Sequence, residues 1–319
     1  MHGVLAACGR LNRENFHTMK VVRAVFWIVA ILTVTSATDP LFAWGPATHI
    51  AMGEDILRNL GLLPAAVAAL LAKNTIAYLY GNIAADIVFA KRLSRIKQFC
   101  HHWPTGLGLL RTAPNEGTRA FAYGYLSHLA ADTVAHGKFV PHLVTLSGGG
   151  INTGHLYWEL RADAGQTQQT WSVLRSILGQ DHNEHHDVLS GHLSDTLFSY
   201  GTNRFLFNRL NALSLNRSFR RSVSFVDRWS RWELEGSMLS SYHNDSVDRI
   251  ISVLSDAQRS PVLSEDPNGT WALLNLRDQR RGERRIRLSR RVSLSIGGAL
   301  APSTPTGRHR TGKGMQPPS

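Results

Sequence analysis

The stretch that decides the fold is residues 118–140, TRAFAYGYLSHLAADTVAHGKFV. Phe121, Tyr125 and Leu129 recur at helical spacing in it, and small alanines fill the positions between them. This pattern predicts a helix that is apolar on most sides and therefore largely buried. We expect the helix to end at Pro141, because the residue before a proline is biased away from the helical conformation.

Helical patterns also dominate the chain on both sides of this stretch. Residues 104–117 are the exception, and we expect a loop there because Gly, Pro and Asn are scattered through them. No period-two alternation, no βαβ pattern and no internal repeat is found. The sequence therefore predicts an all-α fold, a multi-helix bundle. The other expected helices cover residues 48–60, 64–80, 155–164, 170–178, 186–200, 205–213 and 229–255.

Ionisable residues recur every four positions on the buried stretch, as His128, Asp132 and His136. This spacing places all three on one helical face, and His155 with Glu159 repeats it on the next helix. Such groups on a largely buried helix need partners or a metal ion. For either set alone, an ordinary solvated surface contact is the alternative interpretation.

Cysteine is scarce, since the chain holds only Cys8 and Cys100. Two cysteines exclude a disulfide scaffold, and they also exclude a zinc site built on thiolates. Any metal ion must therefore be held by His, Asp and Glu.

The N-terminus has the pattern of an export signal. Basic Lys20 and Arg23 precede an apolar run over residues 24–34, and Ala43 is a small residue suited to cleavage. An uncleaved membrane anchor is the alternative, although the run is short for a membrane span. Cleavage after Ala43 predicts a secreted or periplasmic protein whose mature chain begins at Trp44.

In their order along the chain, the candidate metal ligands resemble those of the zinc-dependent phospholipases C, with the tri-zinc single-strand nucleases as more distant relatives. The similarity covers residues 44–161 and extends to about residue 255. The matching positions are Trp44 in Trp-Gly-Pro-Ala-Thr-His, His49, Asp86, His101, His128, Asp132, His136, His155 and Glu159. At the fourth of these positions the adjacent His102 is an alternative ligand to His101.

The resemblance implies a site for three zinc ions. Asp86, His101, His128 and Asp132 would hold the first ion. Trp44, through its free amino group and carbonyl, and His49 would hold a second ion, with Asp132 bridging the two. His136, His155 and Glu159 would hold the third. Asp86 is the implied candidate for a general base, with a role purely as ligand as the alternative.

The better-known enzymes of this family place six residues between the second acidic ligand and the next histidine. Here the step from Asp132 to His136 is four residues within a continuous helix. This shorter form is similar to a less characterised branch of the family, and it predicts a different position for the third metal ion.

The implied reaction is hydrolysis of phosphate esters by metal-activated water, with phospholipids as substrate. Three zinc ions carry six positive charges against three carboxylates, which would attract a phosphodiester. One alternative is a tri-zinc nuclease or phosphatase acting on nucleic acid or nucleotides. Another is a metal-binding envelope protein without turnover.

The formal net charge is +12, and a late arginine run carries much of it. We divide the chain into residues 1–43 as N-terminal extension and signal peptide, 44–258 as the helical catalytic domain, and 259–319 as a basic, disordered tail. The tail is a candidate for contact with an anionic membrane surface. We expect a monomer, and we interpret His182, His185, His186 and His192 as surface residues.

Overall fold

The structure of the chain is a computed structural model. It describes residues 44–87, 99–148, 150–193, 199–216, 221, 223 and 230–299. Residues 1–43, and with them the predicted signal peptide and cleavage site, lie outside the described residues. Among the described helices, none is long and apolar enough to cross a membrane.

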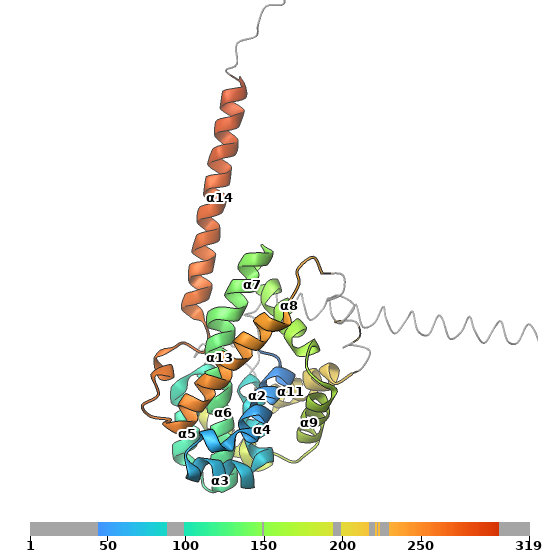
Figure 1. Cartoon of the computed structure of the whole chain (residues 1–319), viewed down its shortest axis with the longest axis vertical. Helices are drawn as coiled ribbons and strands as arrows, with labels where there is room; N and C mark the ends of the chain where they lie inside the picture. Colours follow the sequence, from blue (N-terminus) through green and yellow to red (C-terminus); the bar gives the residue numbers. More distant parts are fainter. Residues whose placement is uncertain are drawn as a thin grey trace, which may run out of the picture. The chain divides into compact units, whose positions relative to one another are not determined.

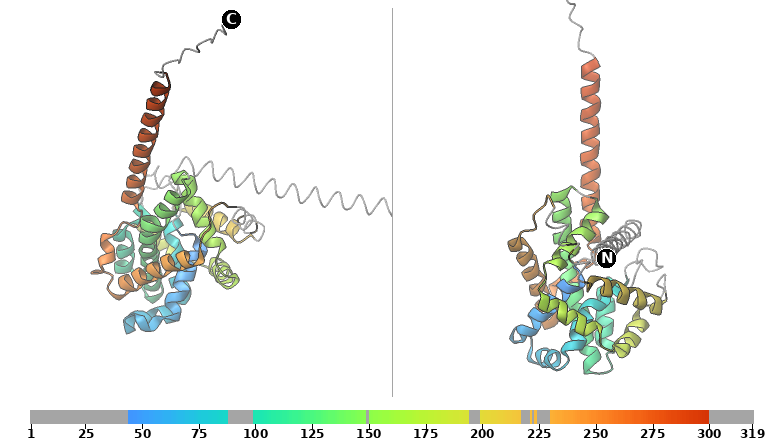
Figure 2. Two further views of the ribbon diagram at one scale, coloured as in Figure 1. Left: turned by 45° about the horizontal axis from the view of Figure 1, so that its top comes forward. Right: turned by 90° about the vertical axis from the view of Figure 1, so that its right-hand side faces the viewer.

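Helices make up the fold, and no strand occurs in the described part of the chain (Figure 1). Figure 2 shows the same helices from two further directions. This confirms the predicted all-α class. The α-helices are α2 (Pro46–Arg58), α3 (Ala65–Lys73), α4 (Thr75–Ala84), α5 (Trp103–Thr112), α6 (Glu116–Val134), α7 (Val140–Ser147), α8 (Ile151–Ala164), α9 (Gln168–Leu178), α10 (Asn183–His192), α11 (Tyr200–Ser214), α13 (Gly236–Ser255) and α14 (Thr270–Ala299). The short 3-10 helices are η1 (Leu60–Leu62), η2 (Ala85–Ile87), η4 (Phe99–His101) and η6 (Pro261–Ser264), and η5 (Ala135–Phe139) is a π-helical turn.

Helix α6 is the centre of the bundle and packs against α4, α5 and α13. Glycine brings α4 and α6 unusually close, since a Cβ on Gly81 would collide with the carbonyl of Phe121, and one on Gly124 with the carbonyl of Tyr78. Asn115 caps the start of α6 by accepting a hydrogen bond from the Thr118 amide at 2.9 Å. The close approach brings the residues that follow α4 next to the buried face of α6.

The predicted helix over residues 118–140 differs from the structure at its end. Helix α6 stops at Val134, the wider π-helical turn η5 follows, and α7 then begins at Val140. Pro141 occupies the first turn of α7 instead of ending the long helix. Proline fits this position because the first amides of a helix have no intrahelical partner.

The loop expected over residues 104–117 is a helix, α5, for most of its length. Pro104 lies in its first turn, where proline is tolerated. Its glycines allow close packing, because a Cβ on Gly106 would lie 2.7 Å from Leu126. The prediction was wrong here because these residues serve helix packing and not a turn.

The disordered tail expected from residue 259 onward also differs from the structure. Turn η6 and helix α14 occupy this part of the chain, and the larger compact unit extends to Leu276 before a second unit begins at Arg277. Val262 and Leu276 are buried. Only a few apolar residues of this segment are buried, and many polar residues separate them. The polar composition therefore predicted disorder although the segment as far as Leu276 packs against the bundle.

Candidate metal centre

Four separate elements supply the five side chains at the centre of the bundle. His49 comes from α2, Asp86 from η2, His101 from η4, and His128 with Asp132 from α6. All five are buried to 4% exposure or less. Ionisable groups at this depth are costly without compensating partners or a metal ion.

Asp132 lies at the middle of this group. Its Oδ2 is 3.1 Å from Nε2 of His101 and 3.1 Å from Nε2 of His128, and its Oδ1 is 3.3 Å from Nε2 of His49. Asp86 adds an Oδ1 atom 3.3 Å from Nε2 of His101. Within the described residues, neither carboxylate oxygen of Asp132 forms a geometrically acceptable hydrogen bond. The nitrogens are therefore close to Asp132 without donating to it.

These spacings fit a metal coordination shell. Ligand atoms 2.0–2.1 Å from a tetrahedral zinc ion are about 3.3 Å from one another. His101 and His128 also bring their Nε2 atoms to 3.0 Å. Among the described residues, two three-ligand groups have all their ligand atoms within 4.8 Å of one another. They are His101, His128 and Asp132, and His49, Asp86 and His128.

The backbone fixes the protonation of His128. Its Nδ1 lies 2.8 Å from the carbonyl oxygen of Asn82, which can only accept a hydrogen bond. Nδ1 of His128 therefore carries a proton, and Nε2, which faces Asp132, is the nitrogen left to bind a metal ion. A backbone carbonyl that orients an imidazole in this way is the usual outer partner of a metal-binding histidine.

This tautomer also limits how ions share the ligands. Nε2 is the only free ligand atom of His128, so it can serve one ion. The two oxygens of Asp132 face different imidazoles, Oδ1 toward His49 and Oδ2 toward His101 and His128. Asp132 is therefore the residue whose geometry suits a bridge between two ions.

The electrostatics favour neutral imidazole and ionised carboxylate, the forms that bind metal. Burial lowers the pKa of His49, and the nearby His128, whose ring stacks on it at 3.9 Å, lowers it further. For Asp132, burial acts to raise the pKa, but the nearby imidazoles of His128, His101 and His49 outweigh it and hold the pKa well below its ordinary value.

The third predicted set, His136, His155 and Glu159, lies beside this group, but its ligand atoms are more widely spaced. All three are buried, and the rings of His136 and His155 meet edge to face at 4.9 Å. Nε2 of His136 is 3.8 Å from Oδ2 of Asp132. Neither three-ligand group found among the described residues includes members of this set.

The structure distinguishes the two adjacent histidines of the His-His-Trp motif. His101 is buried in the ligand group, whereas His102 is exposed. Trp44 is fully buried directly before α2, and its ring packs on Phe139 at 4.3 Å. Cys100, next to His101, is also buried.

Asp163 anchors the N-terminal end of the site, although it is not among the predicted site residues. From α8, its carboxylate accepts hydrogen bonds from the Ala47 amide at 3.2 Å, the Thr48 amide at 2.8 Å and the Thr48 hydroxyl at 2.7 Å. It thereby caps α2, and a Cβ on Gly45 would collide with it. Its position four residues after Glu159, on the same helical face, was the available signal.

Three of the four late histidines are buried, so their interpretation as surface residues was wrong. His186 lies between two tyrosines, with Nε2 3.0 Å from the Tyr80 hydroxyl and Nδ1 2.5 Å from the Tyr200 hydroxyl. The ring of His182 stacks on Tyr80 at 3.6 Å. His182 and His185 are buried with it, and His192 is half-buried. Aromatic packing from other helices covers these imidazoles, which their own segment does not reveal.

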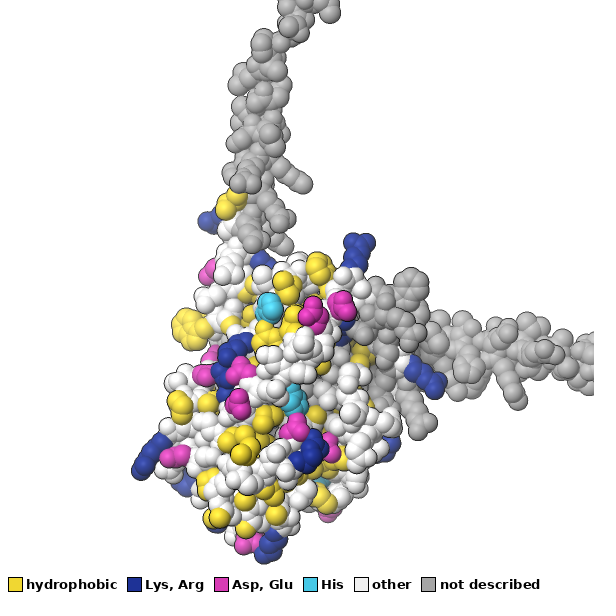
Figure 3. All heavy atoms as spheres, viewed as in Figure 1, with side chains coloured by type: hydrophobic (Ala, Val, Ile, Leu, Met, Phe, Trp, Pro, Cys, Tyr) yellow, Lys and Arg dark blue, Asp and Glu magenta, His cyan; other side chains and the backbone are white. Residues whose placement is uncertain are grey.

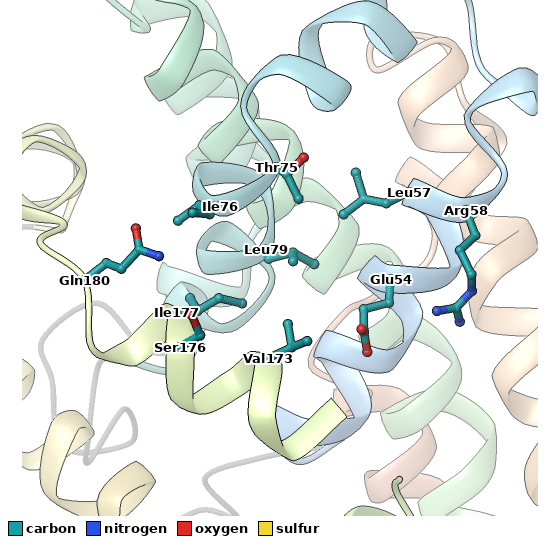
Figure 4. A pocket seen from close by; sticks show the side chains of 10 residues that line it. All are labelled: Glu54, Leu57, Arg58, Thr75, Ile76, Leu79, Val173, Ser176, Ile177 and Gln180. Carbon is teal, nitrogen blue, oxygen red and sulfur yellow. The ribbon is translucent and has the colours of Figure 1, made fainter. Parts of the chain in front are cut away.

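A cavity of about 370 Å³ lies elsewhere, between α2, α4 and α9 (Figure 4). Leu57, Leu79 and Ile177 form part of its apolar wall, and Glu54 and Arg58 lie at its polar edge. None of the predicted metal ligands lines it. The cavity therefore adds nothing to the metal centre.

Residues 48–205 match the model of a family described as zinc dependent phospholipase C. No curated protein and no solved structure matches the chain. The matched segment contains every predicted ligand except Trp44, and it ends well before α13 and α14.

Proposed function

This chain belongs to the zinc-dependent phospholipase C family, whose members are hydrolases of phosphoric ester bonds, and we propose that it is an exported phosphodiesterase that hydrolyses phospholipids with three zinc ions. The observation that carries the proposal is the position of Asp132, with its two oxygens within 3.3 Å of three buried imidazole nitrogens. A buried carboxylate surrounded in this way serves metal ions better than it serves packing.

Each residue has a defined task in this proposal. Asp132 would be shared by two ions, with His101 and His128 as the other ligands on its Oδ2 side and His49 on its Oδ1 side. Asp86 contributes a ligand oxygen, and its carboxylate is also the candidate general base that removes a proton from the attacking water. Zinc ions, when bound, lower the pKa of a coordinated water and stabilise the negative charge on the phosphoryl oxygens.

The third ion would be held by His136, His155 and Glu159. Their burial and the 4.9 Å contact between the two rings support this assignment. The π-helical turn η5 supports it further, because such turns are frequent at functional sites and this one contains His136.

Export completes the site in this proposal. Removal of residues 1–43 would free the amino group of Trp44, which would hold the second ion together with His49. The burial of Trp44 against Phe139 supports a position inside the fold for the new N-terminus. The mature catalytic domain then runs from Trp44 through the predicted boundary at residue 258 and includes the packed segment to Leu276. We propose that it acts as a secreted or periplasmic monomer.

Contact with the lipid surface is assigned to the C-terminal basic segment. Residues 44–276 carry 20 basic and 19 acidic residues, whereas residues 277–319 carry 11 basic and 2 acidic residues. On the face drawn in Figure 3, basic and acidic side chains of the described residues are interspersed. Each basic residue near an anionic membrane contributes about 1 kcal/mol of attraction. The segment therefore suits a peripheral contact with acidic lipids.

The test uses the zinc-loaded protein beginning at Trp44. We expect it to release the phosphorylated headgroup from phosphatidylcholine vesicles. Cleavage of single-stranded DNA or a phosphate monoester with intact lipid would replace the proposal by a nuclease or phosphatase. Zinc retained without any hydrolysis would replace it by a non-catalytic metal-binding protein.

A separate assay tests the lipid contact. We expect the full mature protein to sediment with vesicles containing phosphatidylglycerol, and high salt to weaken that binding by screening. A chain ending at Leu276 should not sediment with them. Equal sedimentation of both chains would contradict the role of the basic segment.

A further inference from the structure

A turn between η6 and α14 lies directly on the metal centre, although it is outside the segment that matches the family. We call residues 265–269 the C-terminal turn. It contacts two of the predicted ligands, one through a hydrogen bond and one through close packing. Neither contact comes from a residue that the family resemblance identified.

The hydrogen bond holds the chain at His101. The side-chain amide of Asn268 donates to the carbonyl oxygen of His101 at 2.9 Å. Two residues further along, the indole of Trp103 donates to the carbonyl oxygen of Glu265 at 2.9 Å. The turn and the His101–Trp103 segment are therefore joined at both ends.

The packing contact holds His136. Gly269 has a φ of +58°, in the left-handed region that favours glycine. A Cβ on Gly269 would lie 2.5 Å from both Cβ and the carbonyl oxygen of His136. Glycine is required here for two reasons, its backbone conformation and its distance from the ligand-bearing turn η5.

The turn is itself held rigidly. Oδ1 of Asp266 accepts a hydrogen bond from the Asn268 amide at 2.9 Å, and its Oδ2 accepts one from the Thr270 amide at 2.7 Å at the start of α14. Arg249 of α13 pairs with Glu265 at 3.1 Å. A segment fixed by these contacts can hold its neighbours in one position.

We propose that the C-terminal turn positions zinc ligands, with Asn268 fixing His101 and Gly269 fixing His136. The inference rests on the proposed function, because it takes both histidines as ligands. Neither Asn268 nor Gly269 touches substrate or metal in this proposal. They are positioning residues, in a part of the chain that does not belong to the family segment.

The test replaces Asn268 by Asp, which keeps the shape but removes the donor to His101. Asn74→Asp is the matched control, because the Asn74 amide also donates to a backbone carbonyl, that of Leu70, at 2.9 Å from a part-buried position remote from the metal centre. Zinc affinity is measured by chelator competition, and cobalt-substituted protein gives a visible spectrum of the coordination shell. Phospholipid hydrolysis is measured in parallel, together with a thermal unfolding curve.

We expect Asn268→Asp to lower zinc affinity about 10-fold, the lower end of the effect of losing a partner of a ligand side chain, because Asn268 holds the backbone of His101, and to change the cobalt spectrum. Asn74→Asp should change neither. Zinc affinity and spectrum equal to wild type in Asn268→Asp would overturn the inference. If this variant folds poorly, Asn268→Ala removes the donor without adding a charge, and the same two measurements decide.

The two proposals fail in distinguishable ways. Lower zinc affinity in a protein that cleaves no phospholipid overturns the proposed function and keeps the positioning role. Full phospholipase activity with unchanged zinc affinity in the Asn268 variants overturns the positioning role alone.

Discussion

Helix α6 and the C-terminal turn both contact the metal centre, but only the helix can be recognised from the sequence. His128 and Asp132 lie four residues apart on a buried helix, so their chemistry and their spacing are visible together. Asn268 and Gly269 lie in a polar segment with no such pattern, and their role depends on packing against residues more than 130 positions away. The candidate ligands on α6 leave a local signature in the sequence, whereas Asn268 and Gly269 do not.

Replacement of Asp132 by Ala tests the helix side of this comparison and has the largest expected effect. Both oxygens that face the imidazoles are lost, so we expect zinc binding to fail and hydrolysis to fall on the order of 10³-fold, the loss of several kcal/mol of metal-supplied stabilisation. Metal content by mass spectrometry and a lipid hydrolysis assay measure it. Asp187→Asn, at an exposed acid on α10, should leave both unchanged.

Residues retained before Trp44 give the next largest effect. A protein that begins at Ala43 has no free amine on Trp44, so we expect it to hold about one zinc ion fewer than the protein that begins at Trp44. Metal content of the two purified proteins measures the difference. Equal zinc content would show that the resemblance does not extend to the N-terminal ligand.

Asp163→Ala sharpens the comparison, because Asp163 anchors α2 as the turn anchors η4. We expect a loss of about 2 kcal/mol in the free energy of unfolding of the metal-free protein, from the cap and its hydrogen bonds. Burial raises the pKa of Asp163 to about 6, despite the hydrogen bonds from Thr48 and Ala47. Because this pKa lies above the unfolded value, stability from Asp163 is fully present below about pH 4 and is lost as the pH rises through about 6.

Denaturant unfolding at pH 5 and pH 7 checks this sign. The loss of unfolding free energy in Asp163→Ala, relative to wild type, should be larger at pH 5 than at pH 7. A cost that grows toward pH 7 would contradict the direction of the pKa shift. Thr167→Ala, which removes the cap of the neighbouring helix α9, serves as the control without a titrating group.

His186→Gln has the smallest expected effect. Burial, followed by the charges of Arg204, His182 and His185, lowers the pKa of His186 to about 3. The unfolded chain binds this proton near pH 6.5, so the wild-type protein loses stability as the pH falls from about 6.5 toward 3. The Gln variant should show a shallower decline in unfolding free energy over this range. Asn183→Gln on the same helix should keep the wild-type slope.

The comparison also shows how far prediction from sequence extends. The all-α class follows from helical periodicity, and so does the position of His128 and Asp132 on one buried helical face. His49, Asp86 and His101 could be proposed as ligands only from the resemblance to the zinc-dependent phospholipases C, because no local spacing links them to α6. The helix α5 was missed because Pro104, Gly106 and Gly108 are also typical of loops, and only contact with Leu126 and His192 explains the glycines. The buried His182–His186 group was missed because Tyr80, which covers it, comes from a helix 100 residues earlier.

The sequence by itself determined which side chains are available for the candidate metal centre, imidazoles and carboxylates without thiolates, and it set His128 with Asp132 and His155 with Glu159 at helical spacing. Only the tertiary structure decided which histidine of the adjacent pair is buried, how the two oxygens of Asp132 divide between imidazoles, and that residues 265–269 close on His101 and His136. The physical reason is the distance along the chain over which each property is set. Helical periodicity is a local property of the chain, whereas the direction of a side chain and its distance from a distant backbone depend on how all the helices pack together.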